Sequence, residues 1–256
     1  MPKREDKTVN RPDRVAIVTG GTRGIGAAIS RRLAVDGATV AAVYNTNRQT
    51  AEHFAEQVVA DDLSVSVHQA NVANPGDCQR VADEVLHQYG RIDYLINNAG
   101  VVRDRTALKM QLLDWDQVIK TNLSGPFFMA RAVLGHMLER GSGRIVNIGS
   151  FVARTGRVGQ ANYAAAKSGL FGLTRTLALE TAQKGVTVNC VIPGAIRTEM
   201  SGALPEEILE AVIQTVPMHE LGTPEDVAQA VHYLVSDEAH YLTGVFLPVA
   251  GGLIMM

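Results

Sequence analysis

Short apolar runs recur along the chain, and each is followed by a longer segment whose apolar residues repeat with helical periodicity. The runs are nearly continuous rather than alternating, which is typical of parallel strands buried on both faces. They comprise Val15–Thr19, Ala38–Val43, Ser64–His68, Ile92–Ile96, Arg144–Ile148, Val186–Val191 and Val245–Val249. Because strands and helices alternate throughout, these runs predict an α/β fold, a doubly wound seven-stranded parallel sheet with helices on both faces.

Two of the intervening helices carry clear start and stop signals. Asn74-Pro75 opens one helix, and Gly90 closes it. Another opens at Thr223-Pro224-Glu225-Asp226, where a capping hydroxyl precedes a proline and acidic residues. Proline suits the first helical position, and acids in the first turn complement the helix dipole. We therefore expect helices to begin directly after Asn74 and Thr223.

The length of the chain and its uninterrupted pattern of strands and helices predict a single domain after a short N-terminal tail. No linker, repeat or low-complexity segment interrupts residues 14–256, which we expect to form a single domain. Residues 1–13 are basic, lack the apolar stretch of a secretion signal, and are expected to form a flexible tail. Residues 195–221 are a candidate lid, because long segments of this kind at a crevice are commonly functional.

The lid segment contains one short amphipathic helix in this interpretation. It would begin at Pro205-Glu206-Glu207. Its apolar face would consist of Leu204, Ile208, Leu209, Val212 and Ile213. Such a face could cover a bound ligand or pack on the domain, and the sequence does not distinguish the two.

The charge balance and the cysteines exclude several function classes. A net charge of −2 gives no global field that would attract nucleic acid or an anionic membrane. No stretch approaches the roughly 18 apolar residues that are needed to span a bilayer. Cys78 and Cys190 are isolated and lack metal-ligand spacing, so we expect no metal site and a reducing, cytoplasmic environment.

The first strand leads into a glycine-rich turn. The segment Thr19-Gly20-Gly21-Thr22-Arg23-Gly24-Ile25-Gly26 precedes a helix that we predict over Ala27–Val35. Glycines at these positions allow a tight turn and a close approach of the backbone to a diphosphate. A helix N-terminus favours an anion through its dipole and its free N–H groups. The strand–turn–helix context therefore predicts a dinucleotide cofactor.

A second constellation indicates proton chemistry. Tyr163 and Lys167 lie four residues apart in an alanine-rich segment, so they share one face of a predicted helix. Ser150 follows the strand Arg144–Ile148, at the end of a strand that faces the ligand crevice of such folds. A tyrosine with a pKa lowered by a nearby ammonium could donate a proton to a carbonyl oxygen, which the Ser150 hydroxyl would polarise.

These motifs together resemble the short-chain dehydrogenase/reductase family. The G-x3-G-x-G spacing, Asn97-Asn98-Ala99-Gly100 after the fourth strand and Pro193-Gly194 after the sixth carry the resemblance, which covers residues 14–252. It implies a Rossmann-type fold with catalytic residues Asn122, Ser150, Tyr163 and Lys167, where Asn122 would link the lysine to a water chain. The alternative for Asn122 is a local cap between Trp115–Thr121 and the next helix. The implied cofactor-binding residues are Gly20, Thr22, Arg23, Gly24, Ile25, Gly26, Asn45, Arg48, Asn71, Val72, Asn98, Ala99, Gly100, Tyr163, Lys167, Pro193, Gly194 and Ile196.

The end of the second strand favours NADP(H) over NAD(H). An acidic residue that would bind both ribose hydroxyls is missing from the segment 43–48. Arg23 and Arg48 are instead placed to meet a 2′-phosphate, which an arginine can bind bidentately. In the family an Asp-Val pair after the third strand holds the adenine, and Asn71-Val72 stands at that position here.

Within this family the chain resembles bacterial 3-oxoacyl-thioester reductases. The matching segments are Arg103-Asp104-Arg105-Thr106, Gly159-Gln160-Ala161-Asn162-Tyr163 and the apolar terminus at 251–256. This resemblance implies NADPH-dependent reduction of acetoacetyl-CoA or of a 3-oxoacyl group on acyl carrier protein, with Ser150, Gln160 and Tyr163 contacting the substrate. Arg140-Gly141 and Lys184-Gly185 match the CoA enzymes better, because the carrier-protein enzymes place basic residues where Gly141 and Lys184 stand.

The resemblance also implies a homotetramer packed through two long helices and the C-terminal strand. Burial between subunits would explain the apolar residues Leu253–Met256, although disorder of the last two methionines is the simpler alternative. The sequence is also compatible with two other functions. One is another small-carbonyl or alcohol dehydrogenase of the same family, and the other is a non-catalytic NADP-sensing protein.

Overall fold

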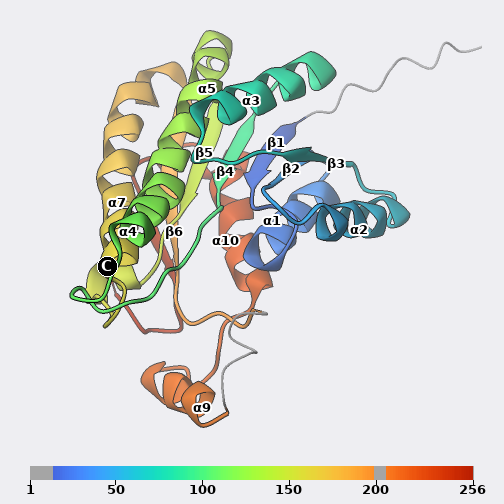
Figure 1. Cartoon of the computed structure of the whole chain (residues 1–256). Coiled ribbons are helices and arrows are strands. Elements are labelled where there is room, and N and C mark those ends of the chain that lie inside the picture. Colours follow the sequence, from blue (N-terminus) through green and yellow to red (C-terminus); the bar gives the residue numbers. More distant parts are fainter. Residues whose placement is uncertain (1–13, 199–205, 256) are drawn as a thin grey trace, which may run out of the picture.

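A computed structural model describes residues 14–198 and 206–255. Its centre is one parallel sheet with the strand order β3-β2-β1-β4-β5-β6-β7 (Figure 1). The strands are β1 (Val15–Thr19), β2 (Thr39–Tyr44), β3 (Val65–Gln69), β4 (Tyr94–Asn97), β5 (Gly143–Ile148), β6 (Val186–Pro193) and β7 (Phe246–Val249). The predicted seven-stranded parallel sheet is confirmed.

Helices cover both faces of this sheet. They are α1 (Gly24–Val35), α2 (Arg48–Ala60), α3 (Pro75–Tyr89), α4 (Leu112–Ile119), α5 (Gly125–Arg140), α6 (Val152–Thr155), α7 (Ala161–Thr181), α9 (Glu206–Thr215) and α10 (Pro224–Val235). Apolar side chains of α1, α2 and α10 pack on one face, and those of α3, α5 and α7 pack on the other. No helix within the described residues is both long and apolar enough to cross a membrane.

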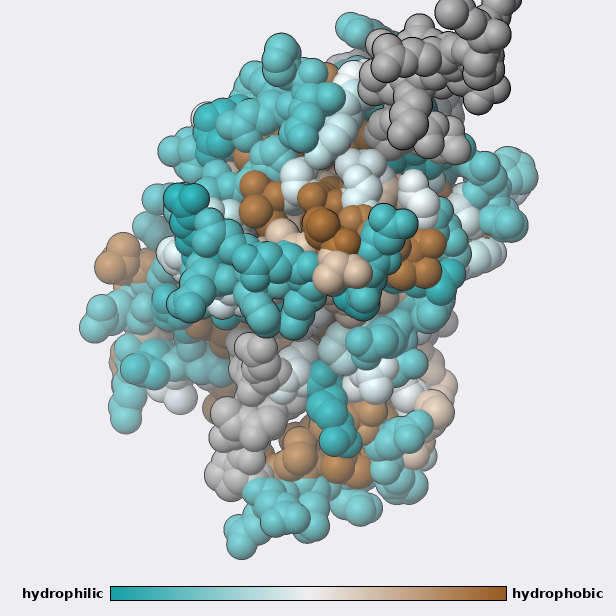
Figure 2. Space-filling model, turned by 90° about the vertical axis from the view of Figure 1, so that its right-hand side faces the viewer, coloured by the Kyte–Doolittle hydropathy of each residue, from teal (hydrophilic) through white to brown (hydrophobic). Residues whose placement is uncertain are grey.

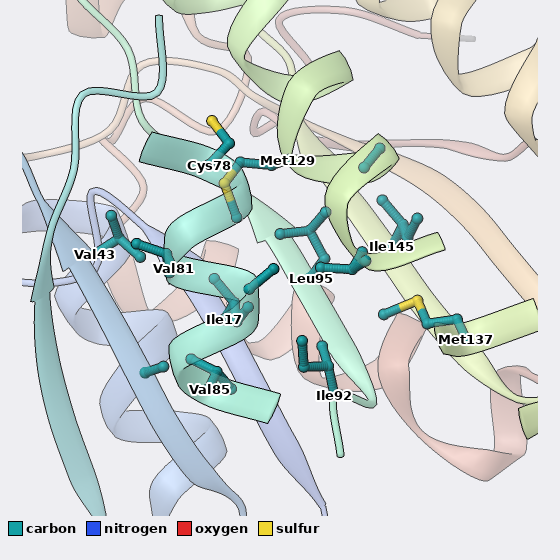
Figure 3. Packing of buried hydrophobic residues seen from close by; sticks show 14 of the residues in the cluster. Ile17, Val43, Cys78, Val81, Val85, Ile92, Leu95, Met129, Met137 and Ile145 are labelled. Carbon is teal, nitrogen blue, oxygen red and sulfur yellow. The ribbon is translucent and has the colours of Figure 1, made fainter. Parts of the chain in front are cut away.

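The continuous apolar runs form strands because side chains on both faces of the sheet are buried. Along β1, Ile17 contributes to the core under α3 and α5, whereas Val18 contributes to the core under α1 and α10. Figure 3 shows the first of these cores, where Leu95 and Ile145 of the sheet lie beneath Met129 of α5. Burying apolar surface on two faces at once fixes the central strands firmly.

The predicted helix signals are confirmed in the structure. The Asn74 side chain accepts a hydrogen bond from Gly76 N at 2.8 Å, and Gly90 ends α3 with a left-handed φ of 75°. Thr223 and Asp226 form a reciprocal capping box at α10. The start of α1 differs from its prediction, because the helix begins at Gly24 rather than three residues later. Glycine is unfavourable in helix interiors, so the sequence pattern predicted that α1 begins only after the last glycine of the turn.

The order of the strands determines where a ligand binds. Strands β1 and β4 lie side by side, and the chain proceeds outward from them in opposite directions. In such sheets a crevice forms beyond the carboxyl ends of the strands at this switch point. The segments that follow β1, β2, β3, β4, β5 and β6 carry the candidate residues and leave this same edge.

The structure describes only part of the candidate lid, residues 195–198 and 206–221. Residues 199–205, which include Leu204 and Pro205, lie outside the described residues, and α9 begins at Glu206. No residue of α9 is fully buried, and Ile208 is 47% exposed. Helix α9 extends away from the sheet below the other helices (Figure 1), and apolar atoms are visible on the lowest part of the molecule in Figure 2. The helix is therefore not packed on the domain as a core element.

Candidate active site

Tyr163, Ser150 and Lys167 meet at the carboxyl end of β5. Tyr163 and Lys167 lie on the first turns of α7, and Ser150 follows β5 by two residues. The Ser150 hydroxyl lies close enough to the Tyr163 phenol to affect its pKa. The Lys167 Nζ lies 5.8 Å from the centroid of the Tyr163 ring and donates a hydrogen bond to Ile148 O at 2.6 Å. The three side chains that the sequence singled out are therefore brought together.

Burial governs the protonation of this group of residues. Desolvation raises the pKa of Tyr163, while its hydrogen bond to Ser150 opposes the shift and the charge of Asp104 adds to it. Desolvation also lowers the pKa of Lys167 to about 8, and the nearby Cys190 opposes that shift. We expected a nearby ammonium to lower the pKa of the tyrosine, but burial of the phenol raises it instead. Tyr163 is thus held as a neutral phenol, which is the form that donates a proton.

The Asn122 side chain binds the backbone of a neighbouring loop and does not cap a helix. It is fully buried in a π-helical turn, Lys120–Ser124, between α4 and α5. Its Nδ2 donates to Val101 O at 2.9 Å, and its Oδ1 accepts from Val101 N at 2.8 Å. The alternative of a local cap is therefore wrong. Both ends of the side chain are used to hold the segment that follows Asn97-Asn98-Ala99-Gly100.

The glycine turn has the features that a diphosphate site requires. Helix α1 has no side-chain cap and no acidic residue in its first turn, so its dipole is not neutralised locally. A Cβ on Gly26 would lie 2.0 Å from Gly20 O, so only glycine fits there. Gly24 has a left-handed φ of 50° with open space beside it. A dinucleotide would find free N–H groups and an unobstructed approach at this turn.

The loop after β4 is tied to the glycine turn. Asn98 Nδ2 donates to Thr19 O at 2.9 Å and to Gly20 O at 3.1 Å. The Thr19 hydroxyl accepts hydrogen bonds from the backbone N–H groups of Asn98 and Ala99, both at 3.0 Å. Gly100 follows beside the Asn122 side chain. These contacts hold the ends of β1 and β4 at a fixed separation. Thr22 and Ile25 belong to the glycine turn between β1 and α1.

The two arginines proposed for a 2′-phosphate have different surroundings. Arg23 is exposed at the start of α1 and forms no ion pair with another described residue. Arg48 lies in the first turn of α2, where its Nε donates to Glu52 Oε1 at 2.7 Å. Asn45 lies exposed between them in sequence. Arg23 is therefore the cation whose charge is available to a ligand.

The remaining predicted cofactor residues lie at the ends of β3 and β6. Asn71 Oδ1 accepts from Ala73 N at 3.0 Å, so its amide nitrogen is the group left for an adenine, and Val72 is buried against Gly125. After β6, Gly194 N donates to Val249 O at 2.9 Å. Ile196 forms a parallel bridge with Gly222. Pro193 and Gly194 are thereby held at the crevice edge next to the C-terminal strand.

Gln160 and Asp104 form a pair that the sequence did not reveal. Gln160 Nε2 donates to both carboxylate oxygens of Asp104, at 3.1 and 2.9 Å. Gln160 is 6% exposed, and its Oε1 is buried without a hydrogen-bond partner in the described residues. The two residues are 56 positions apart, so only the fold shows their contact. In the sequence the two residues belong to separate motifs, Arg103-Asp104-Arg105-Thr106 and Gly159-Gln160-Ala161-Asn162-Tyr163.

Two features lie outside this group. A cavity of about 140 Å³ between Arg14, Tyr94 and His232 opens at the amino ends of the strands, opposite the candidate site. At the C-terminus, Ile254 packs against Phe171, Cys190 and Ile192 of the same chain, and Met255 is 81% exposed. Met256 lies outside the described residues. Burial of Ile254 therefore needs no second subunit.

The fold and the site together define a class of enzyme. A family model described as enoyl-(acyl carrier protein) reductase matches residues 20–254. The chain belongs to the short-chain dehydrogenase/reductase family, whose reductases use nicotinamide cofactors, and it is an oxidoreductase of that family.

Individual relatives are similar over nearly the whole length. The chain is 43% identical over 243 residues to an acetoacetyl-CoA reductase of Allochromatium vinosum, covering 94% of this chain and 99% of that protein. It is 40% identical over 248 residues to the 3-oxoacyl-[acyl-carrier-protein] reductase FabG of Escherichia coli, covering 97% and 100%. The FabG of Staphylococcus epidermidis is 40% identical over 240 residues, covering 94% and 98%.

Proposed function

We propose that this protein reduces a 3-oxoacyl thioester to the 3-hydroxyacyl thioester with NADPH, and that Tyr163 donates the proton. The observation that carries the proposal is the placement of the Tyr163 and Ser150 hydroxyls together, beside the buried Lys167. Relatives named acetoacetyl-CoA reductase and FabG support a thioester as the substrate. Together these observations favour ketone reduction over the other chemistries of the family.

The reaction follows from the chemistry of the side chains. A bound NADPH would supply the hydride that the carbonyl carbon of the substrate receives. The Ser150 hydroxyl polarises the carbonyl oxygen by donating a hydrogen bond, and the neutral Tyr163 phenol transfers its proton to that oxygen. The resulting phenolate is stabilised by the ammonium of Lys167, which burial keeps away from competing solvent. Asn122 acts indirectly, because it fixes the backbone at Val101 beside the crevice.

Most of the residues that would hold the cofactor follow the carboxyl ends of β1, β2, β3, β4 and β6. The N–H groups at the start of α1 would bind the diphosphate, and Asn71 would meet the adenine. Pro193, Gly194 and Ile196 would lie beside the nicotinamide carboxamide. Arg23 would bind the 2′-phosphate that distinguishes NADPH from NADH, because its guanidinium has no carboxylate partner among the described residues.

Replacing Arg23 should therefore change cofactor choice. In Arg23→Gln we expect KM for NADPH to rise about tenfold and KM for NADH to change little, since a charge-assisted hydrogen bond to phosphate is lost. Arg48→Gln is the matched variant and should have a smaller effect, because Glu52 already engages Arg48. Steady-state kinetics with both cofactors measure this. An equal loss with NADPH and NADH would contradict the role of Arg23.

The substrate is tested by direct comparison. We expect oxidation of NADPH with acetoacetyl-CoA, and slower or absent turnover with cyclic ketones, sugars, steroids and the enoyl thioester crotonyl-CoA. The enoyl substrate is included because the matching family model is named for an enoyl reductase. If no 3-oxoacyl thioester is reduced, whether carried by coenzyme A or by acyl carrier protein, the proposed function is wrong.

We also propose that the active form is a homotetramer packed through the long helices α5 and α7. Phe127 of α5 is 43% exposed and Leu179 of α7 is 83% exposed. Large apolar side chains exposed on neighbouring helices favour burial against another subunit. The exposed Met255 beyond β7 is consistent with a third contact near the C-terminal strand.

A further inference from the structure

The arginines without a carboxylate partner are concentrated at one edge of the sheet. Eight of the described arginines form ion pairs with acidic residues: Arg14, Arg31, Arg32, Arg48, Arg80, Arg91, Arg140 and Arg144. The others form none with described residues, and most of these follow the carboxyl ends of strands: Arg23 after β1, Arg103 and Arg105 after β4, Arg154 and Arg157 after β5, and Arg197 after β6. Positive charge without a carboxylate partner is therefore concentrated at the edge of the sheet that carries the candidate site, although the whole chain has a net charge of −2.

Four of these residues, Arg103, Arg105, Arg154 and Arg157, form what we call the arginine rim. Their two loops are joined by a hydrogen bond from Arg105 N to Gly159 O at 2.9 Å. A second contact runs from Asn162 Nδ2 to Arg103 O at 3.1 Å. All four side chains are exposed, as is Lys109 on the first loop. The two loops contain one acidic residue, Asp104, whose carboxylate is held by Gln160.

A second observation at the same place indicates a ligand rather than a solvated surface. The Gln160 Oε1 is buried and has no hydrogen-bond partner in the described residues. Because both hydrogen bonds of its amide nitrogen go to Asp104, the orientation of the amide is fixed and the oxygen remains as a free acceptor. A buried acceptor without a donor is unfavourable by about 1–3 kcal/mol, so a ligand N–H would relieve it. Gln160 directly precedes α7, three residues before Tyr163.

We propose that the arginine rim binds the phosphates of a coenzyme A thioester, and that Gln160 Oε1 accepts a hydrogen bond from an amide N–H of its pantetheine arm. The inference rests on the proposed function and specifies its substrate. A coenzyme A thioester carries a carbonyl at one end, amide N–H groups along its arm, and a diphosphate and a 3′-phosphate at the other end. Several cations spread over two loops suit such a polyphosphate better than the single phosphodiester of a carrier-protein arm.

Thioesters with and without phosphates test the rim. In Arg103→Gln/Arg105→Gln and in Arg154→Gln/Arg157→Gln, we expect the ratio of kcat/KM for acetoacetyl-CoA to that for acetoacetyl-N-acetylcysteamine to fall about tenfold. The same ratio should fall with added salt in the unmodified protein, since exposed charges are screened. The matched control is Arg31→Gln, which removes a paired arginine of α1 and should leave the ratio unchanged.

The test of Gln160 uses the same two thioesters. N-acetylcysteamine retains an amide N–H, so Gln160→Met should raise KM about fivefold for both thioesters and leave their ratio unchanged. A change in kcat without a change in KM would overturn the assignment of Gln160 to the pantetheine arm.

The outcomes separate this inference from the proposed function. If both thioesters are turned over and neither double variant changes their ratio, the rim does not bind coenzyme A and the proposed function stands. If the double variants impair turnover of acetoacetyl-acyl carrier protein but not of acetoacetyl-CoA, the rim serves a protein carrier and the inference is wrong. If no thioester is reduced, the proposed function itself is wrong.

Discussion

Replacing Tyr163 with phenylalanine should lower kcat for acetoacetyl-CoA reduction by about a hundredfold to ten-thousandfold, because general acid catalysis contributes on the order of 10²–10⁴. The substitution removes one hydroxyl and keeps the ring, which lies 5.8 Å from Lys167 Nζ. The proton must then come from water, which burial of the site restricts. Stopped-flow or steady-state oxidation of NADPH measures the loss.

The controls for this variant decide between an enzyme and a cofactor sensor. Binding of NADPH, followed by its fluorescence, should change less than about twofold, since the diphosphate and 2′-phosphate contacts are elsewhere. Tyr241→Phe is the matched variant and should keep full activity, because Tyr241 is 91% exposed and precedes the amino end of β7, opposite the crevice. Unchanged turnover in Tyr163→Phe would contradict the proposed proton donor. Absence of turnover in the unmodified protein would favour a non-catalytic NADP-binding role.

The pattern of the sequence was sufficient to predict the sheet. All seven strands appear where the apolar runs stand. The central strands are clearest in the sequence, because a strand buried on both faces leaves no polar alternation. The ends of the strands were predicted less accurately, since β6 continues to Pro193, two residues beyond the predicted end at Val191. Strand ends depend on hydrogen bonds to a neighbour, and here Gly194 N pairs with Val249 O from 55 residues further along the chain.

The candidate site was predicted to different extents for different residues. Tyr163, Lys167 and Ser150 follow from local spacing, and the structure places them together. The neutral phenol could not be foreseen, because the balance of burial and charge at Tyr163 depends on contacts across the fold. Arg48 is a different case. Its spacing of four residues from Glu52 was visible in the sequence and already indicated an ion pair along a helix.

Contacts between distant segments could not be predicted. The π-helical turn at Asn122 exists because its side chain binds Val101, 21 residues earlier. The pair of Gln160 and Asp104 and the gathering of the arginine rim also require two loops that meet only in the folded chain. Side chains of these types are ordinary surface residues in a sequence, and only their shared surroundings give them a candidate role.

Replacing Lys167 with methionine should reduce activity by at least about a hundredfold and alter stability in a pH-dependent way. Activity falls because the charge that stabilises the phenolate is removed, an electrostatic contribution worth about 3 kcal/mol or more. Methionine has a similar length and no charge, so the packing under α7 is largely kept. The loss should appear in kcat, with the dissociation constant of NADPH changed less.

The effect on stability follows from the pKa of the lysine. Burial lowers the pKa of Lys167 to about 8 from its ordinary value of 10.5. Below pH 8 the ammonium is protonated in both the folded and the unfolded chain, and its burial opposes folding by about 3 kcal/mol. Between pH 8 and 10.5 the folded chain releases the proton first, so this unfavourable contribution decreases and vanishes above the unfolded value.

The free energy of unfolding of Lys167→Met relative to the unmodified protein should therefore fall as the pH rises. We expect a change of about 2–3 kcal/mol between pH 7 and pH 10, measured by denaturant titration at one protein concentration. The lost hydrogen bond to Ile148 O lowers the stability of the variant at every pH and does not affect this trend. Lys109→Met, at an exposed position, should show no such pH dependence. A constant difference across this range would mean that the lysine is not buried as a charge, and that the site does not hold an ammonium ready for the phenolate.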